Sequence, residues 1–512
     1  MHPINRSFGV VGGDGVLGAA DVFFKMIKSA SASEDGERLD IVFEQHPIQS
    51  DVSDDPHSTQ RKLYVYDTIL SLESRGVTTV VLPSFVSHLY LEQLRENCAI
   101  EIVDMVEGLH AHVRRRFPGI RRVGILTSDS IAESGLFERY FANPQFEVLY
   151  PQVDEGEHSN RVTQAVYGRS GVESGNWAGR SIELLREACA GLMARGADLL
   201  LTGLTELGLV VEHLEPLDVP LVDANCVYAQ YVLNGQYASR TRTFKVGVVG
   251  GVGPAATVDF MQKIVRNTPA TRDQDHIKLL VEQNPQIPDR TESLVAGGAD
   301  PTVSLYATCK KLEAGAADII AIPCNTAHAF VERIQPYLNV PIVNMLTVTA
   351  ELLRATFPTL REVGLLATTG TIASRVYERP LTAAGLVQVT PAPALQERVM
   401  RAIYGPKGVK AGYTTGECMD DIAAACDGLM ERGCQVIILG CTELPLLLPQ
   451  GERSSASGRV AWLADPTEIL AKRCVAYARG EIEAPGARGA STPADVSRAA
   501  RRATTATPFS ST

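Results

Sequence analysis

The feature that most constrains the fold is an internal repeat with a period of about 240 residues. The segment Phe8-Gly-Val-Val-Gly-Gly13 matches Val246-Gly-Val-Val-Gly-Gly251, and Leu201-Thr-Gly-Leu-Thr-Glu-Leu207 matches Ile438-Leu-Gly-Cys-Thr-Glu-Leu444. Four further matches lie between these two in the same order and at nearly the same offset. Because chance rarely produces such an ordered series, the sequence predicts two homologous domains, 1–241 and 242–480.

Short apolar runs rich in β-branched residues alternate with amphipathic stretches in each copy. In the second copy the apolar runs are residues 246–249, 318–322, 363–366 and 436–439. This alternation is typical of an α/β fold with doubly wound parallel sheets. The two strand-and-loop motifs that start at residues 246 and 320 also resemble the two that start at residues 363 and 438. We therefore expect each half to contain two pseudo-symmetric lobes. Functional residues should then lie in the cleft, at the carboxyl ends of strands.

The composition limits the partners that the protein can have. A chain of 512 residues with 45% hydrophobic and 21% charged residues is globular. Its net charge of -11 and the absence of a basic block argue against nucleic acid and anionic membranes. The apolar runs are too short to span a membrane, and no signal peptide is expected. Ten irregularly spaced cysteines fit the reducing cytoplasm. Residues 481–512, rich in Ala, Pro, Ser, Thr and Arg, are expected to form a disordered tail.

Two cysteines of the second copy are the candidate acid/base groups. Cys324 and Cys441 each follow an apolar strand and precede polar residues, where amide donors and a helix N-terminus favour a thiolate. One comes from each lobe, so the two thiols can face one carbon from opposite sides. Such a pair suits a reaction that removes a proton from one face and returns a proton to the other. Ordinary buried cysteines are the alternative, and core packing is the better interpretation of Cys418, Cys426 and Cys434.

The motifs around these cysteines resemble those of the aspartate/glutamate racemase family, which needs no pyridoxal phosphate. The resemblance covers nearly all of the second copy. It rests on Gly250-Gly-Val-Gly-Pro254, Asn284-Pro-Gln-Ile-Pro-Asp-Arg-Thr291, Pro323-Cys-Asn-Thr-Ala-His328, Ala367-Thr-Thr-Gly-Thr371, Lys410-Ala-Gly412 and Gly440-Cys-Thr-Glu-Leu444. The aspartate racemase branch fits better, because glutamate racemases carry Asp-Ser-Gly in the first loop and a histidine where Glu443 stands here.

The resemblance implies a racemase that acts on aspartate or glutamate without a metal or organic cofactor. Cys324 and Cys441 would be the acid/base residues, and Arg290 and Lys410 would hold the substrate carboxylates. Further substrate contacts would come from Asn325, Thr326, Thr368, Thr369, Thr442, Gly251 and Gly253. His328 and Glu443 are candidates for tuning the thiols, although the first could pack within its helix and the second could cap one.

Other interpretations stay open. Arg290 could be a surface arginine, Lys407 could replace Lys410, and the threonines could be helix caps. A dinucleotide site is disfavoured, because the Gly-Gly-x-Gly spacing is not that of the Rossmann loop. Two further functions compete with racemisation. One is another isomerase of the superfamily, similar to maleate isomerase or hydantoin racemase, in which a cysteine acts as nucleophile. The other is a non-catalytic sensor of acidic amino acids.

The first copy lacks the residues that would carry the reaction. Ser84 stands in place of Cys324, Leu204 in place of Cys441 and Glu173 in place of Lys410, and the segment matching Arg290, residues 48–53, holds no arginine. Leucine transfers no proton and serine is a far weaker acid than cysteine. We therefore predict a degenerate domain kept for packing, with a ligand-binding regulatory domain or a one-base site of Ser84 and His88 as alternatives. Because the family typically dimerises, the resemblance implies that the halves dock as a pseudo-dimer, with a further homodimer left open.

Overall fold

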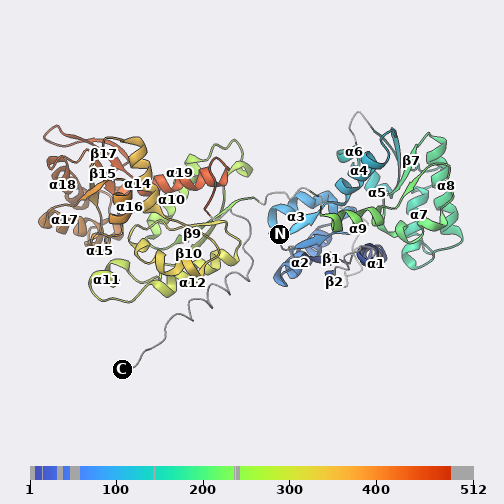
Figure 1. Cartoon of the computed structure of the whole chain (residues 1–512), viewed down its shortest axis with the longest axis horizontal. Helices are drawn as coiled ribbons and strands as arrows, with labels where there is room; N and C mark the ends of the chain where they lie inside the picture. The colour runs from blue at the N-terminus through green and yellow to red at the C-terminus, as the bar shows by residue number, and fades with distance from the viewer. Residues whose placement is uncertain are drawn as a thin grey trace, which may run out of the picture. The chain divides into compact units, whose positions relative to one another are not determined.

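The computed structural model describes residues 6–13, 15–31, 39–46, 58–141, 146–235, 237 and 243–485. The contacts divide the chain into two compact units, Met1–Arg242 and Thr243–Thr512, which we call the first and the second unit (Figure 1). Each unit contains two sheets whose strands alternate with helices along the chain. The predicted fold class, α/β with two tandem halves of two parallel-sheet lobes each, is confirmed. Residues 48–53 and the predicted tail from residue 486 onward lie outside the described residues.

The first unit has two four-stranded parallel sheets, with the orders β2-β1-β3-β4 and β6-β5-β7-β8. Their strands are β1 (Ser7–Val11), β2 (Asp40–Glu44), β3 (Thr79–Val81), β4 (Glu101–Val103), β5 (Arg122–Leu126), β6 (Glu147–Leu149), β7 (Leu199–Thr202) and β8 (Leu221–Val222). The helices are α1 (Val16–Ser31), α2 (Thr59–Ser74), α3 (Leu91–Asn97), α4 (Met105–Arg116), α5 (Asp129–Glu133), α6 (Glu138–Phe141), α7 (Arg161–Tyr167), α8 (Arg180–Ala194) and α9 (Ala224–Asn234).

The second unit repeats this plan and adds one strand. Its sheets have the orders β10-β9-β11-β12 and β14-β13-β15-β17-β16. The strands are β9 (Lys245–Gly250), β10 (Lys278–Gln283), β11 (Ile319–Ala321), β12 (Ile342–Val343), β13 (Glu362–Leu366), β14 (Val387–Val389), β15 (Val436–Leu439), β16 (Gly451–Ser454) and β17 (Val460–Ala464). Strand β16 runs antiparallel to β17, which the repeat did not predict. The hairpin adds an edge strand to an otherwise parallel sheet, as is common in α/β folds.

The helices of the second unit are α10 (Pro254–Asn267), α11 (Arg290–Val295), α12 (Thr302–Ala314), α13 (Val331–Ile334), α14 (Met345–Thr356), α15 (Thr369–Ala373), α16 (Glu378–Ala383), α17 (Pro393–Tyr404), α18 (Glu417–Glu431) and α19 (Pro466–Ala478). Local chemistry sets several of their boundaries. The Asn344 side chain accepts from the N–H groups of Leu346 and Thr347 and so caps α14. Pro254 starts α10 at a position where its missing N–H costs no helical hydrogen bond.

The strand order places four loops of the second unit at ligand-binding positions. The direction of the chain connections reverses between β9 and β11 in one sheet and between β13 and β15 in the other. Ligands in doubly wound sheets bind at such switch points, beyond the carboxyl ends of the strands. The loops at these ends carry Val252, Cys324, Thr368 and Cys441. The topology therefore brings one cysteine to the switch point of each sheet.

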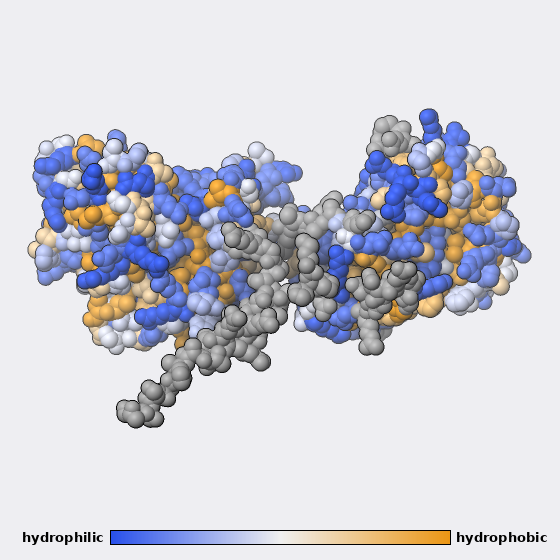
Figure 2. All heavy atoms as spheres, in the orientation of Figure 1, coloured by the Kyte–Doolittle hydropathy of each residue, from blue (hydrophilic) through white to orange (hydrophobic). Residues whose placement is uncertain are grey.

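The core and the surface follow the expected division of side chains. Cys418, Cys426 and Cys434 lie in one buried apolar cluster of the second unit, which confirms the packing interpretation of these three residues. All ten cysteines are free thiols. Figure 2 shows hydrophilic side chains over much of the visible face of each unit, broken by smaller hydrophobic patches. Within the described residues, no helix has the length and apolar character needed to cross a membrane.

Candidate active site

Cys324 and Cys441 line one small cavity formed by both lobes of the second unit. Their side chains are 6% and 7% exposed, and the cavity has a volume of about 10 Å³, roughly the room of one water molecule. The residues that line it are Val252, Arg290, Thr291, Cys324, Asn325, Thr326, Thr368, Tyr404, Lys410, Cys441, Thr442 and Glu443. Both predicted acid/base residues and both predicted cations are therefore brought together.

Arg290 is a buried cation beside Cys324. It is the first residue of α11, and its Nη1 donates to the carbonyl groups of Ile287 and Pro288 at 3.2 and 3.1 Å. Its side chain lines the cavity together with Cys324. Burial favours a lower pKa for Arg290, but the negative charge of a Cys324 thiolate, and then of Asp289, outweighs it and leaves the pKa raised. The guanidinium Nε is buried and has no hydrogen-bond partner among the described residues.

Asn325 offers a second donor without an acceptor. The hydroxyl of Tyr377, which comes from the other lobe, donates to Asn325 Oδ1 at 2.6 Å and so orients the amide. The Nδ2 atom of Asn325 is buried and has no partner in the described part of the chain. Both side chains are 2% exposed or less. Buried donors are normally satisfied, so Arg290 Nε and Asn325 Nδ2 together indicate a site for ligand oxygen atoms.

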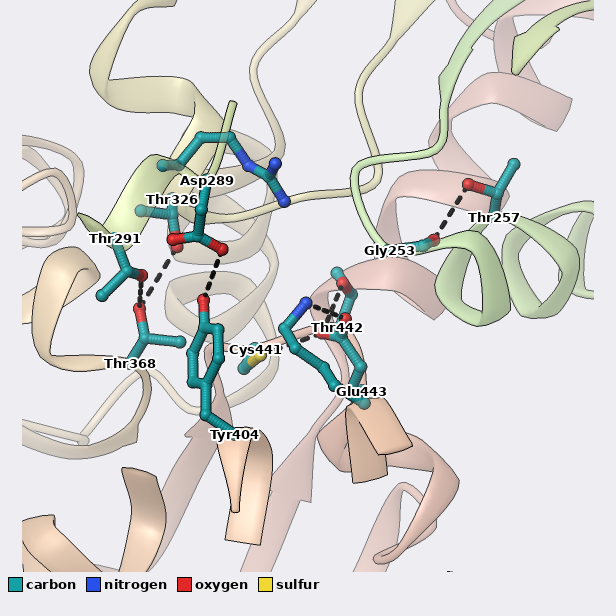
Figure 3. Close-up of polar contacts among 12 residues, drawn as sticks. Gly253, Thr257, Asp289, Thr291, Thr326, Thr368, Tyr404, Cys441, Thr442 and Glu443 are labelled. Carbon is teal, nitrogen blue, oxygen red and sulfur yellow. Dashed lines mark hydrogen bonds and ion pairs between the residues drawn. The ribbon is translucent and has the colours of Figure 1, made fainter. Parts of the chain in front are cut away.

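Four threonine hydroxyls form a hydrogen-bonded cluster at one side of the cavity, and Figure 3 shows three of them, Thr291, Thr326 and Thr368. Thr291 donates to Thr368 at 3.1 Å, and Thr326 pairs with Thr371 at 2.7 Å and with Thr368 at 3.3 Å. Thr326 and Thr291 belong to one lobe, whereas Thr368 and Thr371 belong to the other. The cluster therefore connects the two lobes across the cleft. Thr368 also accepts from the Thr371 N–H and caps α15, as the alternative interpretation of the threonines predicted.

Cys441, Glu443 and Lys410 form a chain of polar contacts on the opposite side of the cavity. Cys441 Sγ donates to Glu443 Oε2 at 3.0 Å, and Lys410 Nζ donates to Glu443 Oε1 at 2.7 Å. Burial and then the Glu443 carboxylate raise the pKa of Cys441 well above its usual value. Burial also favours a higher pKa for Glu443, but the Lys410 ammonium and the hydrogen bonds outweigh it and hold that pKa below its usual value.

Three predicted substrate-binding residues, Gly251, Gly253 and Thr369, do not line this cavity. Gly251 has a φ of 84°, and a Cβ there would lie 2.4 Å from the backbone of Asn284, so this glycine permits a close contact between two loops. Gly253 has a φ of 108°, and its Cβ would lie 2.6 Å from Glu443 Oε1. The backbone N–H of Thr369 contacts the sulfur of Met400 at 3.2 Å. Of the first loop, only Val252 reaches the cavity.

His328 contacts the backbone and not the lining of this cavity. Its Nε2 accepts from the Met345 N–H at 3.1 Å, so its Nδ1 carries the proton and donates to the Cys324 carbonyl at 2.9 Å. Burial lowers its pKa, so the ring is neutral. In the first unit His88 makes the same two contacts with Ser84 and Met105, both at 2.9 Å. Because the arrangement exists where no thiol stands, it supports a packing role for His328.

Tyr404 and Thr291 line the cavity and were not predicted as site residues. The Tyr404 hydroxyl donates to Asp289 Oδ2 at 3.0 Å, and the Lys410 Nζ lies 5.3 Å from the centre of the Tyr404 ring (Figure 3). Burial raises the pKa of Tyr404. The repeat contained a signal for this residue, because both copies have a tyrosine before glycine here, Tyr167 and Tyr404. Thr291 lies at the end of the quoted arginine motif, which contained no sign that it faces the site.

In the first unit two aromatic side chains replace the pair formed by Asn325 and Tyr377. Phe85 stands where Asn325 is, and Phe137 stands where Tyr377 is. Both rings are buried, and their centres lie 5.3 Å apart. Leu204, which replaces Cys441, is 3% exposed. An apolar contact thus replaces the hydrogen-bonded pair that orients the Asn325 amide in the second unit.

The family model described as Asp/Glu/Hydantoin racemase matches residues 11–232 and, a second time, residues 249–474. The chain belongs to this family. The double match also confirms that the two halves are tandem copies of one fold, including the half that lacks both cysteines.

Curated relatives match shorter segments. A protein of Pectobacterium carotovorum described only as uncharacterized is 40% identical over 115 residues, which are 22% of this chain and 71% of that protein. The broad specificity amino-acid racemase RacX of Bacillus subtilis is 28% identical over 152 residues, 27% of this chain and 61% of RacX. The glutamate racemase of Corynebacterium kroppenstedtii is 32% identical over 139 residues, 27% of this chain and 45% of that enzyme. The matched segments thus span less than two thirds of both named racemases.

Among solved structures, the aspartate racemase of Picrophilus torridus is 29% identical, with 46% of this chain and 94% of that chain covered and a TM-score of 0.40. The glutamate racemase isoform RacE1 of Bacillus anthracis is 16% identical, with 52% and 95% covered and a TM-score of 0.35.

Proposed function

We propose that this protein is a cofactor-independent amino-acid racemase that interconverts the L- and D-forms of aspartate or glutamate in its second unit. One observation carries the proposal: Cys324 and Cys441, from opposite lobes, line the same cavity as the buried cation Arg290. Family membership and the named amino-acid racemases among the relatives support the reaction class. Because the mechanism depends on two free thiols, we also propose a reducing compartment, the cytoplasm.

The unsatisfied donors support a carboxylate substrate. Arg290 Nε and Asn325 Nδ2 are buried without a partner in the described residues, and leaving such groups unpaired is costly. A hydrogen bond from a guanidinium to a carboxylate oxygen is charge-assisted and is stronger than a hydrogen bond between two neutral groups. Lys410, the other predicted cation, is held by Glu443 and still lines the cavity, so its charge reaches the substrate. Two cations suit a substrate with two carboxylates.

The proposed reaction uses one sulfur as base and the other as acid. The thiolate removes the Cα proton, and the electron pair of the broken C–H bond is delocalised into the α-carboxylate, whose growing charge the nearby cations stabilise. The thiol on the opposite face then gives its proton to Cα and becomes a thiolate. One turnover therefore inverts Cα and exchanges the protonation states of Cys324 and Cys441.

We further propose that the first unit is a degenerate racemase domain without this activity. Ser84 and Leu204 replace the two cysteines. The buried Phe85 and Phe137 rings replace a polar pair, which removes the donors that a carboxylate would need. This supports a packing role for the first unit over the one-base alternative.

The test is isotope exchange by the full chain. L-Aspartate and L-glutamate are incubated with the protein in deuterium oxide. The enantiomers are then separated by chiral chromatography, and the deuterium content of each is measured by mass spectrometry. The expected result is the D-enantiomer with deuterium at Cα. Cys324→Ser and Cys441→Ser should each lower the rate at least about 100-fold, the lower range for loss of an acid/base group, whereas the matched Ser84→Ala variant should keep it. Binding without deuterium exchange, or an equal loss in Ser84→Ala, would overturn the proposal.

A further inference from the structure

The two cysteines of the cavity have neighbours of opposite charge. Cys324 lines the cavity together with the cationic side chain of Arg290. Cys441 Sγ instead lies 3.0 Å from Glu443 Oε2, a carboxylate oxygen that can only accept a proton from it. A cation favours a thiolate beside it, and an anion favours the protonated thiol. The two sulfurs are equally buried, so this difference in charge distinguishes them.

The carboxylate of Glu443 is held in place on several sides. Its Oε1 accepts from Lys410 Nζ at 2.7 Å, and its Oε2 also accepts from Thr442 Oγ1 at 3.4 Å (Figure 3). A Cβ atom at position 253 would lie only 2.6 Å from Glu443 Oε1. Glycine at this position therefore lets the carboxylate approach the first loop. The Glu443 side chain is 4% exposed. It therefore cannot turn toward solvent without breaking these contacts.

The other charged and titratable groups near the two sulfurs keep this asymmetry. Lys410 partly offsets Glu443 at Cys441, yet Glu443 and burial prevail and the pKa of Cys441 is raised. Tyr404 lies next to Lys410, and burial raises its pKa, so it is neutral. On the other side Asp289 accepts from Tyr404, and its charge acts on Arg290. His328, behind the Cys324 loop, is neutral.

We propose that Glu443 is a positioning residue that holds Cys441 as the protonated thiol in the resting protein, so that Cys441 is the proton donor of the first turnover. In the first turnover Cys324 would take the Cα proton and Cys441 would deliver its own to the opposite face. This consequence rests on the proposed racemase function, whereas the protonation states themselves can be measured without any substrate.

The first unit contains a matched control for Glu443. Glu206 occupies the same place in the repeat, is 4% exposed and accepts from Thr205 Oγ1 at 3.4 Å. Leu204 stands in the place of Cys441, and its side chain has no acidic proton. Glu206→Gln therefore removes a buried carboxylate of the same kind without changing the charge beside either cysteine of the cavity.

The test is the pH dependence of alkylation of the full chain by iodoacetamide, which reacts with thiolates, read for each cysteine by peptide mass spectrometry. In the unaltered protein Cys441 should react only at a pH well above that at which an ordinary thiol reacts, because burial and Glu443 raise its pKa. In Glu443→Gln the remaining charged neighbour of Cys441 is Lys410, so Cys441 should react at least about tenfold faster near pH 8, which corresponds to a fall of one pKa unit. Glu443→Asp should restore much of the protection, and Glu206→Gln should change nothing.

Two internal checks make each outcome decisive. Cys309 and Cys474 are buried thiols, and burial raises the pKa of each to about 12, so their alkylation would report unfolding of a variant. If the reagent reaches neither cavity cysteine, thiolate ultraviolet absorbance near neutral pH, compared between the unaltered protein, Cys324→Ser and Cys441→Ser, shows which sulfur is charged. A thiolate at Cys441, or an unchanged Cys441 profile in folded Glu443→Gln, would overturn the proposal, whether or not the protein racemises an amino acid.

Discussion

The hydrogen bond between Tyr377 and Asn325 can be removed with almost no change in shape. Tyr377→Phe deletes one hydroxyl group from a side chain that is fully buried. Asn325 Oδ1 then loses the donor that lies 2.6 Å away, and the amide keeps no contact that fixes its direction. A buried acceptor that loses its donor costs about 1–3 kcal/mol. For a unit of this size each kcal/mol lowers the melting temperature by about 2–4 °C, so we expect a drop of about 2–12 °C.

Scanning calorimetry of the full chain measures this shift, and the first unit offers the reverse substitution as a control. Phe137→Tyr places a hydroxyl group beside Phe85, which has no acceptor for it, and should also destabilise the chain. Adding Phe85→Asn should recover part of that loss, because the pair of the second unit is then rebuilt. We also expect Tyr377→Phe to raise KM in the racemase assay, since the Asn325 donor is no longer oriented. An unchanged melting temperature in Tyr377→Phe would refute the argument that this hydrogen bond holds the amide.

Two further substitutions test other parts of the second unit. Lys263 is nearly buried between Asp259 and Asp465, with 2.5 Å between Nζ and Asp465 Oδ2, so Lys263→Met should cost about 3–5 kcal/mol near neutral pH in urea unfolding. Burial raises the pKa of Asp465, and without the cation this pKa rises further, so the loss of stability should shrink as the pH falls and Asp465 is protonated. The matched Lys25→Met, at a more exposed site, should cost less. An equal loss at all pH values would contradict this reasoning. Gly253→Ala strains a backbone with a φ of 108° and pushes against Glu443, which in turn contacts the acid/base residue Cys441, so racemisation should fall at least about tenfold. Gly433→Ala, with a φ of 90° and open space around it, should lose only stability. Equal activities of the two variants would show that the loop does not position Glu443.

The fold and the two cysteines could be predicted from the sequence because their signals are local or repeated. A buried parallel strand needs a short apolar run, as in Val436–Leu439, and the residue after it must lie at the carboxyl end of the sheet. The repeat then supplied the comparison that separated the two halves: Cys324 and Cys441 in one, Ser84 and Leu204 in the other. None of this requires knowledge of how the lobes pack.

The tertiary structure decided which side chains meet. Lys410 lies 33 positions before Glu443 in the chain, and only the folded loops show that the two form an ion pair beside Cys441. The structure also placed Thr369, Gly251 and Gly253 outside the cavity and Tyr404 inside it. Whether a side chain points into a cleft depends on the packing of loops from strands far apart in the sequence, whereas motif spacing reports only the order of residues along the chain.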